Sequence, residues 1–431
     1  MSLLLFIRHP ILRLKRGFTK YPLIIFWRMR FDSLLAKYIG ATLFLRNYAR
    51  LRNSRRKSAI LVVERNIFND DIEALEAYAR KNKPEVVFIH IDSYYRRTIE
   101  NLMLPQEIRA QRNFYAKLPL YRKEVERISK ILYGSLRCLE MILRINIAVF
   151  LSGNVNYAQE YQWIPVMRRK GGVSIALNKE SVIYSPHHER NFIQRHQECN
   201  FRYDGDFALL YNERAKEVYI KSNAITPLQA LVTGCPRVDR LVLLAKASKT
   251  HSNFILLASF GRPNKGGTGL YQEVVETIAG NPYLAEKTLV KCKTPTEAKK
   301  LMMQFPMLKA ASGPMEQYLK MRPAVVVGFN SSTCLDALIA EIPLLVPVWG
   351  DILNLKDGLL LGGHTSSMNF TASSKEDFTT FLKNVLSGGN LFSNKKSWTS
   401  DPAIKNFIEY TYSPLDGKNC ERFFKFVEKF I

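Results

Sequence analysis

Three consecutive hydroxyl residues, Ser331, Ser332 and Thr333, follow a run of valines and a glycine. The valines at residues 325–327 predict a strand that is buried on both faces of a parallel sheet. Hydroxyl residues are good helix N-caps, so a helix is expected to begin at this point. Its free N–H groups and positive dipole end would face the carboxyl end of the strand, where anions bind. The chemistry predicted for this turn is therefore the binding of a phosphate or a diphosphate.

A second loop suited to phosphate follows a strand predicted at residues 253–259. It contains Gly261, Arg262 and Lys265 in the run Phe260-Gly261-Arg262-Pro263-Asn264-Lys265-Gly266-Gly267-Thr268. The loop is not a P-loop, because Lys265 precedes the paired glycines, whereas a P-loop requires Gly-Lys-Ser/Thr. Lys293, at the end of a strand predicted at residues 289–293, adds a cation nearby. We expect Gly261, Arg262, Lys265 and Lys293 to contribute to one anion site.

The run from Gly328 to Leu344 resembles the C-terminal half of GT-B glycosyltransferases. Their pattern is Gly-x-Ser/Thr-Ser/Thr, then an acid with Ala-Leu, then Pro before an apolar strand. Here the acid is Asp336, in Asp336-Ala337-Leu338, and the proline is Pro343. The resemblance implies that Ser331, Ser332 and Thr333 contact the phosphates of an activated donor. It also implies that Asp336 holds the ribose hydroxyls, where most relatives have Glu. The alternative is an ordinary capped helix of any α/β domain.

The turn Gly234-Cys235-Pro236-Arg237-Val238-Asp239 resembles the Gly-x-Pro-Arg-x-Asp turn that closes the N-terminal domain in several GT-B groups. These groups include glycerophosphotransferase-like enzymes of surface polymers and non-hydrolysing sugar-nucleotide epimerases. Gly234 and Pro236 are expected to form a tight turn, and Asp239 to cap the helix that follows. A plain strand-to-helix turn is the alternative.

The candidate catalytic residues lie in the N-terminal half. Glu180 follows a strand predicted at residues 173–177, in the register where related surface-polysaccharide transferases carry an acid-Gly turn; here Ser181 replaces the glycine. A carboxylate at this place could take the proton from an acceptor hydroxyl. His187 and His188 are the second candidates, as a general base or as phosphate ligands. No third ligand at metal-binding spacing accompanies them, so no metal site is predicted. Asp204-Gly205-Asp206 precedes an apolar strand and is interpreted as a turn.

Strands and helices alternate along the chain from about residue 58. This pattern predicts parallel, doubly wound sheets, and 431 residues are too many for one core. The expected fold class is α/β of the GT-B type, with two Rossmann-like domains facing a cleft. The predicted divisions are an amphipathic basic segment at 1–57, an acceptor and catalytic domain at 58–245, a nucleotide-sugar domain at 246–400, and C-terminal helices packing back across the domains at 401–431.

The composition adds two constraints. Six scattered cysteines without a C-x-x-C pair are typical of reduced thiols in a cytoplasmic protein. The formal net charge is +25, and residues 1–60 contain Asp32 as their single acid. Aliphatic and aromatic clusters are interleaved with the cations of this segment, but no run is long enough to span a bilayer. The pattern favours helices lying on an anionic membrane surface. A solvated or nucleic-acid-binding arm is the alternative.

Together these features predict a glycosyltransferase similar to surface-polysaccharide, glycerophosphotransferase-like and polysialyltransferase-like bacterial enzymes. It would move a sugar from a nucleotide-activated donor to a lipid-linked or cell-surface glycan, such as lipopolysaccharide or capsule, on the inner face of the cell membrane. No cofactor and no nucleic-acid partner are expected, and transfer is expected to be metal-independent and inverting. The alternatives are a sugar-nucleotide epimerase, a CDP-alditol phosphotransferase, or a non-catalytic basic binding protein.

Overall fold

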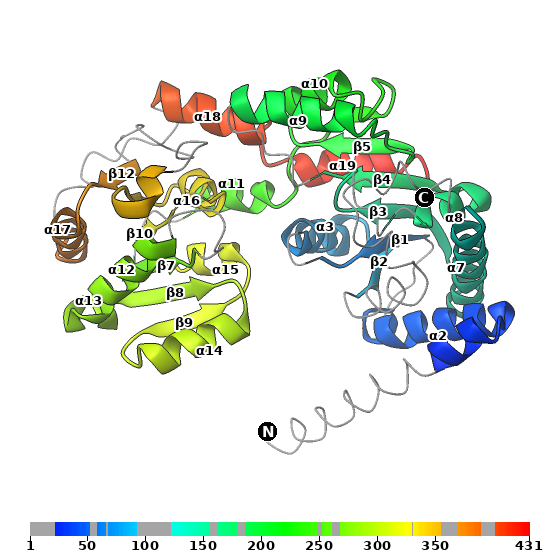
Figure 1. Ribbon diagram of the computed structural model, residues 1–431, viewed down its shortest axis with the longest axis horizontal. Helices are drawn as coiled ribbons and strands as arrows, with labels where there is room; N and C mark the ends of the chain where they lie inside the picture. Colours follow the sequence, from blue (N-terminus) through cyan, green and yellow to red (C-terminus); the bar gives the residue numbers. More distant parts are fainter. Residues whose placement is uncertain are drawn as a thin grey trace, which may run out of the picture. The chain divides into compact units, whose positions relative to one another are not determined.

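The computed structural model describes residues 22–51, 58–65, 68–92, 122–155, 160, 162–178, 186–247, 252–260, 268–329, 331–354, 369–388 and 401–431. The chain forms two compact units, each containing a six-stranded sheet (Figure 1). The first unit holds the described residues before Val182, together with Glu189–Pro236 and Cys420–Ile431. The second holds Arg237–Asn419 together with the short stretch Ile183–His188, of which residues 186–188 are described. We call these units the first and the second domain.

The sheet of the first domain has the strand order β2-β1-β3-β4-β5-β6, and all neighbouring strands are parallel. The strands are β1 (Ser58–Val63), β2 (Val86–Ile91), β3 (Asn146–Ser152), β4 (Val173–Leu177), β5 (Phe207–Leu210) and β6 (Ala230–Val232). They are short apolar runs, as expected of parallel strands that are covered on both faces. β4 and β5 have the bounds that the sequence predicts, 173–177 and 207–210. β1, β2 and β6 differ by one residue at one end from the predicted strands 59–63, 85–91 and 230–233, and β3 is one residue longer at each end than the predicted 147–151.

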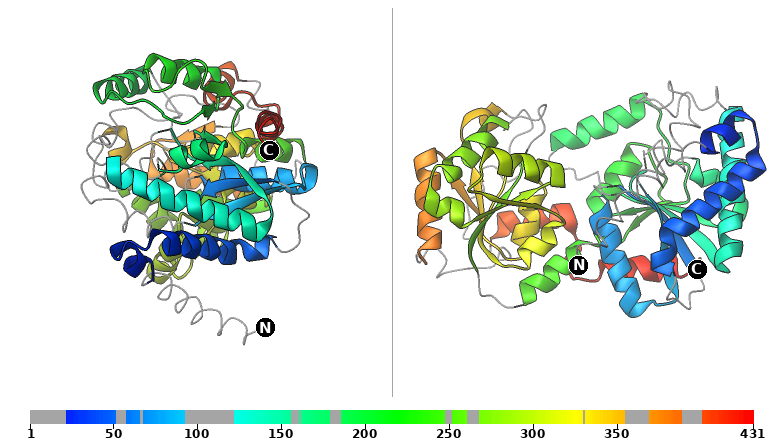
Figure 2. Two further views of the ribbon diagram at one scale, coloured as in Figure 1. Left: turned by 90° about the vertical axis from the view of Figure 1, so that its right-hand side faces the viewer. Right: turned by 90° about the horizontal axis from the view of Figure 1, so that it is seen from below.

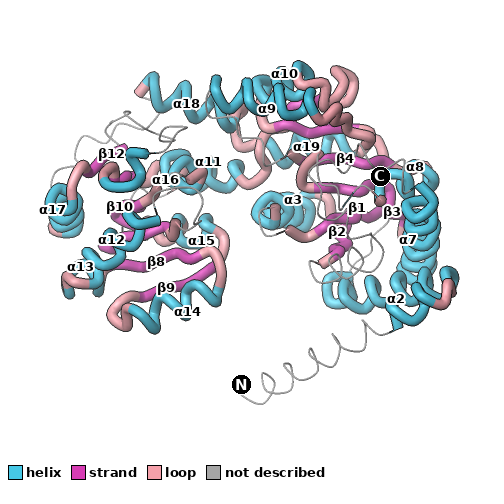
Figure 3. Tube along the Cα trace, in the orientation of Figure 1, coloured by secondary structure: helices cyan, strands magenta, loops and turns pink. Residues whose placement is uncertain are grey.

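Helices cover both faces of this sheet (Figure 3). They are α2 (Asp32–Leu51), α3 (Asn69–Asn82), α7 (Arg122–Leu143), α8 (Trp163–Lys170), α9 (Pro186–Glu198), α10 (Glu213–Lys221) and α19 (Asn419–Val427). Leu61 of β1 packs in the core beneath α2 and α7, whereas Ile60 packs in the core beneath α3 and α19. The alternation follows from the two-residue period of a strand. α19 therefore belongs to the first domain although the whole second domain precedes it in the sequence.

α2 lies directly against α7, and the two helices run side by side (Figure 2). A Cβ at Gly40 would lie 2.6 Å from the Ser135 carbonyl oxygen, so only glycine allows this approach. Leu35, Ile39 and Leu43 of α2 are fully buried in the core between the helices and the sheet. The described part of the segment predicted as membrane-associating, residues 22–51, is thus also part of the first domain; residues 1–21 and 52–57 lie outside the described residues.

α2 also protects the edge of the first sheet. The Asn47 side chain donates to the His90 carbonyl oxygen at 3.0 Å and accepts from the His90 N–H at 2.8 Å. These two bonds occupy main-chain groups on β2, which is an edge strand. An edge strand with unsatisfied groups would be open to pairing with another chain. The side chain of Asn47 therefore serves as a substitute for a neighbouring strand at this point.

The second sheet has the strand order β12-β11-β10-β7-β8-β9, again with parallel neighbours throughout. Its strands are β7 (Ser252–Ala258), β8 (Thr288–Cys292), β9 (Lys309–Ser312), β10 (Pro323–Val327), β11 (Leu344–Pro347) and β12 (Asn369–Ala372). The edge strands β9 and β12 were not predicted from the sequence. Both are four residues long and each contains no valine, isoleucine or leucine, so they lack the apolar run that indicates a buried strand.

One face of the second sheet packs on α12 (Thr268–Ala279), α13 (Pro282–Glu286), α14 (Pro295–Gln304) and α17 (Lys375–Leu386). The remaining elements are α11 (Val238–Lys246), α15 (Met315–Leu319), α16 (Thr333–Ile339), the 3₁₀ helix η3 (Gly350–Asn354) and α18 (Pro402–Tyr412). α16 contacts both α11 and α15. The division between the domains falls at Pro236 and Arg237, earlier than the predicted residue 245, because α11 packs with the second domain.

An ion-pair network attaches α11 to α15. Glu316 accepts hydrogen bonds from Arg240 Nη1 at 2.7 Å and from Lys320 Nζ at 2.6 Å. Burial opposes the ionisation of Glu316, but the hydrogen bonds from Lys320 and Arg240 outweigh it and hold its pKa below the usual value. Because the folded-state pKa is depressed, the stabilisation is complete above the unfolded-state pKa and is lost as the pH falls through the folded-state pKa.

Glu316→Gln is therefore expected to lower the free energy of unfolding by about 1 kcal/mol at neutral pH. The difference from the wild type should disappear in acid, where Glu316 is protonated in both the folded and the unfolded state. Urea unfolding of both proteins at a series of pH values measures it. A difference that stays constant down to the lowest pH would show that the Glu316 carboxylate contributes no charge-dependent stability.

Candidate functional site

The second sheet reverses its strand order between β7 and β10. From β7 the chain proceeds outward to β8 and then β9, whereas from β10 it proceeds the other way to β11 and β12. The two strands are direct neighbours, with Leu257 opposite Val327. Ligands of open α/β sheets bind at the carboxyl ends of the strands where the order reverses. The loops that leave this point begin at Ser259 and at Gly328, and they are the two loops that the sequence predicts for phosphate.

Aromatic side chains pair where these two loops begin. The rings of Phe260 and Phe329 are stacked with centroids 5.6 Å apart, and Tyr271 of α12 meets Phe329 edge-on. Phe260 and Phe329 are both buried. The hydroxyl of Ser259 is buried as well and has no hydrogen-bond partner in the described part of the chain. A buried hydroxyl without a partner is rare in folded proteins, so a polar ligand could satisfy it.

Gly328 is required by the turn that follows β10. A Cβ at this position would lie 2.6 Å from the Cys334 sulfur. The Cys334 thiol donates to the Phe329 carbonyl oxygen at 2.8 Å, which folds the turn back onto α16. Burial raises the pKa of Cys334 to about 12. The thiol therefore stays protonated near neutral pH and acts as a structural donor.

The hydroxyl residues lie at the start of α16, as predicted. The Ser331 and Thr333 hydroxyl oxygens are 2.9 Å apart and share a hydrogen bond. Ser332 is the N-cap residue, but its backbone is helical and its side chain makes no cap bond. The prediction that a hydroxyl side chain caps the helix is therefore not met at Ser332, and Asn330 lies outside the described residues. All three hydroxyl residues are partly exposed, so a ligand could reach them.

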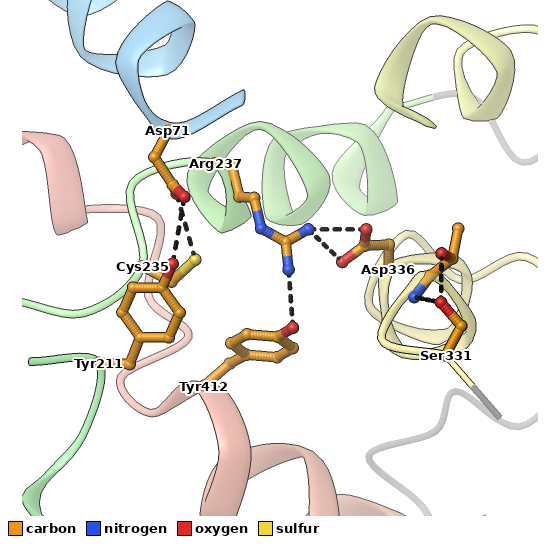
Figure 4. A network of polar contacts seen from close by, with 8 residues as sticks. Asp71, Tyr211, Cys235, Arg237, Ser331, Asp336 and Tyr412 are labelled. Atoms are coloured by element: carbon orange, nitrogen blue, oxygen red, sulfur yellow. Dashed lines mark hydrogen bonds and ion pairs between the residues drawn. The ribbon is translucent and has the colours of Figure 1, made fainter. Parts of the chain in front are cut away.

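Asp336 contacts a residue that the sequence did not connect with it. Both of its carboxylate oxygens accept from Arg237 Nη1, at 2.6 and 2.7 Å (Figure 4). Arg237 Nη2 donates to the Tyr412 hydroxyl at 2.7 Å, and the guanidinium carbon lies 5.2 Å from the centre of that ring. The side chains of Arg237 and Asp336 are 11% and 7% exposed. This buried pair joins α11 to α16, and Tyr412 adds α18.

The Gly234–Asp239 turn makes structural contacts on both sides of the domain division. Gly234 has φ of 82°, as the predicted tight turn requires. In the first domain the Cys235 thiol and the Tyr211 hydroxyl contact the buried carboxylate of Asp71, at 3.5 and 3.1 Å (Figure 4). In the second domain Asp239 lies within α11 and accepts from the Asn419 N–H at 2.9 Å. Asp239 thus stands inside the helix that it was expected to precede as a cap.

Of the predicted cations of the donor site, the structure describes Lys293. Gly261, Arg262 and Lys265 lie outside the described residues. The Lys293 side chain is exposed. The backbone N–H of Lys293 donates to the Glu297 carboxylate at 2.8 Å, at the start of α14. Thr294 is the N-cap of α14 and accepts from the Glu297 N–H. Helix capping therefore accounts for Thr294 and Pro295, which follow Lys293 in the sequence.

A carboxylate already lies at the start of α12, the helix that follows the Gly-rich loop. Asp351 of η3 accepts from the N–H groups of Gly269 and Leu270, both at 3.1 Å. This contact satisfies two of the free donors of the helix. Asp351 was not predicted, because nothing in the sequence connects residue 351 with residue 269. The capping by Asp351 fixes the helix that flanks the predicted phosphate loop.

The described residues do not include the side chains of the predicted catalytic candidates. Glu180 lies beyond the described range, and of His187 and His188 only the backbone is described, in the first turn of α9. The strand before Glu180 is confirmed: β4 ends at Leu177, and the buried Asn178 donates its N–H to the Leu209 carbonyl oxygen at 3.0 Å. Glu180 therefore follows the carboxyl end of a strand inside the first sheet.

Two further groups of charged residues in the first domain have structural explanations. Asp206 precedes β5 and accepts from the Ser174 N–H at 2.7 Å. Gly205 and Asp206 form a bend that leads into the strand, at the place where a turn was predicted. His90 lies between Glu76 and Glu64, at 2.6 and 2.9 Å, beneath α3. Within the described ranges, no group of three or more His, Cys, Asp or Glu is arranged to hold a metal ion.

The chain contains two doubly wound parallel sheets with helices between the strands, and it has the GT-B fold. A variant of the wall teichoic acid polymerase TagF is similar to this chain with a TM-score of 0.50 at 10% identity, over 96% of this chain and 97% of that one. UDP-GlcNAc 2-epimerase from Methanocaldococcus jannaschii aligns with a TM-score of 0.43 at 14% identity, over 86% and 99%. The glycosyltransferase of kitacinnamycin aligns with a TM-score of 0.42 at 13% identity, over 88% and 100%. No protein-family model and no curated protein sequence matches the chain.

Proposed function

We propose that this protein is a glycosyltransferase that takes a sugar from a nucleotide-activated donor. The second domain would bind the donor, and the first domain would supply the acceptor site and the catalytic base. The acceptor would be a lipid-linked or cell-surface glycan, such as lipopolysaccharide or capsule, at the cytoplasmic face of the membrane. Transfer would need no metal ion and would invert the anomeric carbon.

The observation that carries the proposal is that two loops start on neighbouring strands of the second sheet, at the point where the strand order reverses. The sequence marks residues 261–268 and 328–333 independently as phosphate-suited. The strand order places the starts of both loops on the neighbouring strands β7 and β10, where the order reverses. A nucleoside phosphate needs hydrogen-bond donors and cations together. Ser331, Ser332 and Thr333 would supply donors, and Arg262, Lys265 and Lys293 the positive charge.

The buried pair of Arg237 and Asp336 refines the role proposed for Asp336. Aspartate is one methylene shorter than the glutamate that most GT-B relatives carry, and both of its oxygens contact Arg237. We propose that Arg237 fixes the orientation of this carboxylate, so that it can accept from a ribose hydroxyl without changing rotamer.

A thermal-shift screen tests the proposed donor class directly. The purified protein is heated with UDP-, GDP-, CMP- and CDP-linked donors, CDP-glycerol among them, and with the free nucleotides. A ligand at concentration L that binds the folded state stabilises it by RT ln(1 + L/Kd), so the melting temperature rises with the logarithm of the ligand concentration once that concentration exceeds Kd. A sugar nucleotide is expected to give the largest shift. The absence of any shift at millimolar concentration would contradict the proposed donor site.

Ser332→Ala with Thr333→Ala is expected to weaken donor binding by about 1–3 kcal/mol, the scale of losing hydrogen bonds to a charged group. Calorimetry with the donor found in the screen measures the change. Thr379→Ala is a matched control, because the Thr379 hydroxyl donates to the Lys375 carbonyl oxygen within α17 and its loss should leave the affinity unchanged. Equal affinity in the double variant and the wild type would remove the hydroxyl cluster from the site.

A further inference from the structure

The outward face of α2 is apolar although the helix already buries its opposite face. Leu34, Leu45 and Tyr48 are 51%, 70% and 51% exposed. The spacing of residues 34, 45 and 48 places all three on one side of the helix. Ala41, which is partly exposed, lies on the same side between Leu34 and Leu45. A surface helix normally carries polar residues on its outward side. α2 instead presents an apolar surface that nothing in the described part of the chain covers.

The same surface continues into the residues before α2. Ile25, Met29 and Phe31 are 51%, 58% and 44% exposed. They lie in the helix formed by residues 22–28 and in the turn that joins it to α2, where the Phe31 N–H donates to the Phe26 carbonyl oxygen. We use the name docking face for Ile25, Met29, Phe31, Leu34, Leu45 and Tyr48. The docking face thus has six exposed large apolar side chains within 24 residues. On an ordinary protein surface, exposed apolar side chains are scattered singly.

The charges beside the docking face are positive. Arg28, Arg30 and Lys37 are exposed. Asp32 is the single acid in residues 22–51, and its carboxylate accepts from Arg127 at 2.7 Å. The carboxylates of Glu126 and Glu140 on the neighbouring α7 are each paired with a lysine. The carboxylates of Asp32, Glu126 and Glu140 are thus each paired with a cation. Exposed cations set among apolar side chains complement a surface that is both anionic and apolar.

We infer that the docking face binds the surface of an anionic phospholipid bilayer. The apolar side chains would enter the boundary between headgroups and acyl chains, and Arg28, Arg30 and Lys37 would contact the lipid phosphates. A nucleic acid offers the same phosphates but nothing for the leucines and the phenylalanine to enter. The inference deepens the membrane location within the proposed function, and it does not depend on which donor the second domain binds.

The face binds flat on the membrane and does not cross it. None of the described helices combines the length and the hydropathy needed to span a bilayer. Leu35, Ile39 and Leu43, on the opposite side of α2, are fixed in the core of the first domain. The helix therefore cannot leave the domain to insert on its own, and the first domain as a whole would lie against the lipid. Deleting residues 1–50 would disrupt that core, so substitutions at exposed positions give the sharper test.

The experiment is flotation of the full-length protein with vesicles of phosphatidylcholine, alone or mixed with phosphatidylglycerol. The wild type is expected to float with the mixed vesicles and to remain largely at the bottom with the neutral ones. Leu34→Glu with Leu45→Glu should lower the partition coefficient at least about tenfold, since it removes two apolar side chains and adds two negative charges. Salt should weaken the wild-type binding only in part, because the apolar contribution is not screened.

The matched control makes the same change of charge at exposed apolar residues elsewhere. Leu228 lies in the turn before β6 and Met303 near the end of α14, and they are 90% and 83% exposed. Leu228→Glu with Met303→Glu should float like the wild type. Circular dichroism melts of both double variants should match the wild type, since all four positions are on the surface. Equal losses in the two variants would mean that net charge alone drives the binding, and would overturn the assignment of the face.

Two other outcomes would also overturn the inference. Wild-type protein that stays at the bottom with anionic vesicles but retards DNA or RNA at physiological salt would assign the cations to nucleic acid. Wild-type protein that is dimeric in solution and becomes monomeric in the Leu34→Glu, Leu45→Glu variant would assign the face to a second copy of the chain. Donor-induced thermal shifts measured on the same proteins separate this test from that of the proposed function. A variant that loses vesicle binding but keeps the donor-induced thermal shift supports both the membrane binding of the docking face and the proposed donor site.

Discussion

Glu180→Gln is expected to reduce sugar transfer by about a hundredfold to ten-thousandfold while the donor affinity stays close to the wild-type value. A general base acts on the acceptor hydroxyl in the transition state and makes little contribution to binding the donor. Glutamine keeps the shape of the side chain but cannot take a proton. Transfer rates with the donor identified by thermal shift, and calorimetry with that donor, measure the two effects separately.

Glu217→Gln is the matched control for this prediction. Glu217 lies on α10 of the same domain with its side chain 55% exposed, and its substitution should leave transfer unchanged. If Glu180→Gln remains active while His187→Ala or His188→Ala is inactive, the base belongs to the histidine pair instead. A loss of donor affinity in Glu180→Gln would contradict the separation of roles between the two domains.

Arg237→Met should lower the free energy of unfolding of the second domain by about 3–5 kcal/mol. Removing one partner of a buried ion pair leaves the other charge without compensation, and burial makes that costly. Asp336 would lose its contacts at 2.6 and 2.7 Å, and Tyr412 would lose its donor. Native-state hydrogen exchange of the α16 amides measures the change locally, which avoids assuming that a two-domain protein unfolds in one step.

The double variant Arg237→Met, Asp336→Leu tests the cause. Replacing both charges with apolar side chains should restore much of the lost stability, since no uncompensated charge remains. Arg240→Met breaks a more exposed pair, with side chains 26% and 14% exposed, and should cost clearly less. If Arg237→Met costs under 1 kcal/mol, the pair is not a structural connection between α11 and α16. The proposed orientation of Asp336 would then lose its basis.

Elements whose structure is determined by a local sequence pattern could be predicted from the sequence. The apolar runs that form β4 and β5 could be delimited to the residue, because parallel strands buried on both faces contain few polar residues. The turn at Gly328 and the helix start at Thr333 followed from residue types with strong local preferences. The strand order was not predicted, yet it is what brings the starts of the two phosphate-suited loops to neighbouring strands.

The rest depends on contacts between distant residues. Arg237 and Asp336 are 99 positions apart, and neither shows from its neighbours that it will pair with the other. Asp351 meets the start of α12 across 82 positions. For α2 a signal was present: Leu35, Ile39 and Leu43 recur every four residues, which predicts one buried helix face. The basic residues of the segment 1–60 indicate a helix on the surface, so the buried face of α2 was not predicted.

The return of α19 to the first domain has a consequence for synthesis. Phe423 and Phe424 are buried in the core of that domain, where Phe424 stacks on Tyr78 and meets Phe88 edge-on. A growing polypeptide leaves the ribosome from its N-terminus, and domains generally fold as units as they emerge. The first domain therefore lacks the contacts that α19 makes with Tyr78 and Phe88 until all of the second domain has been translated. The domain that is made first is the last to be completed.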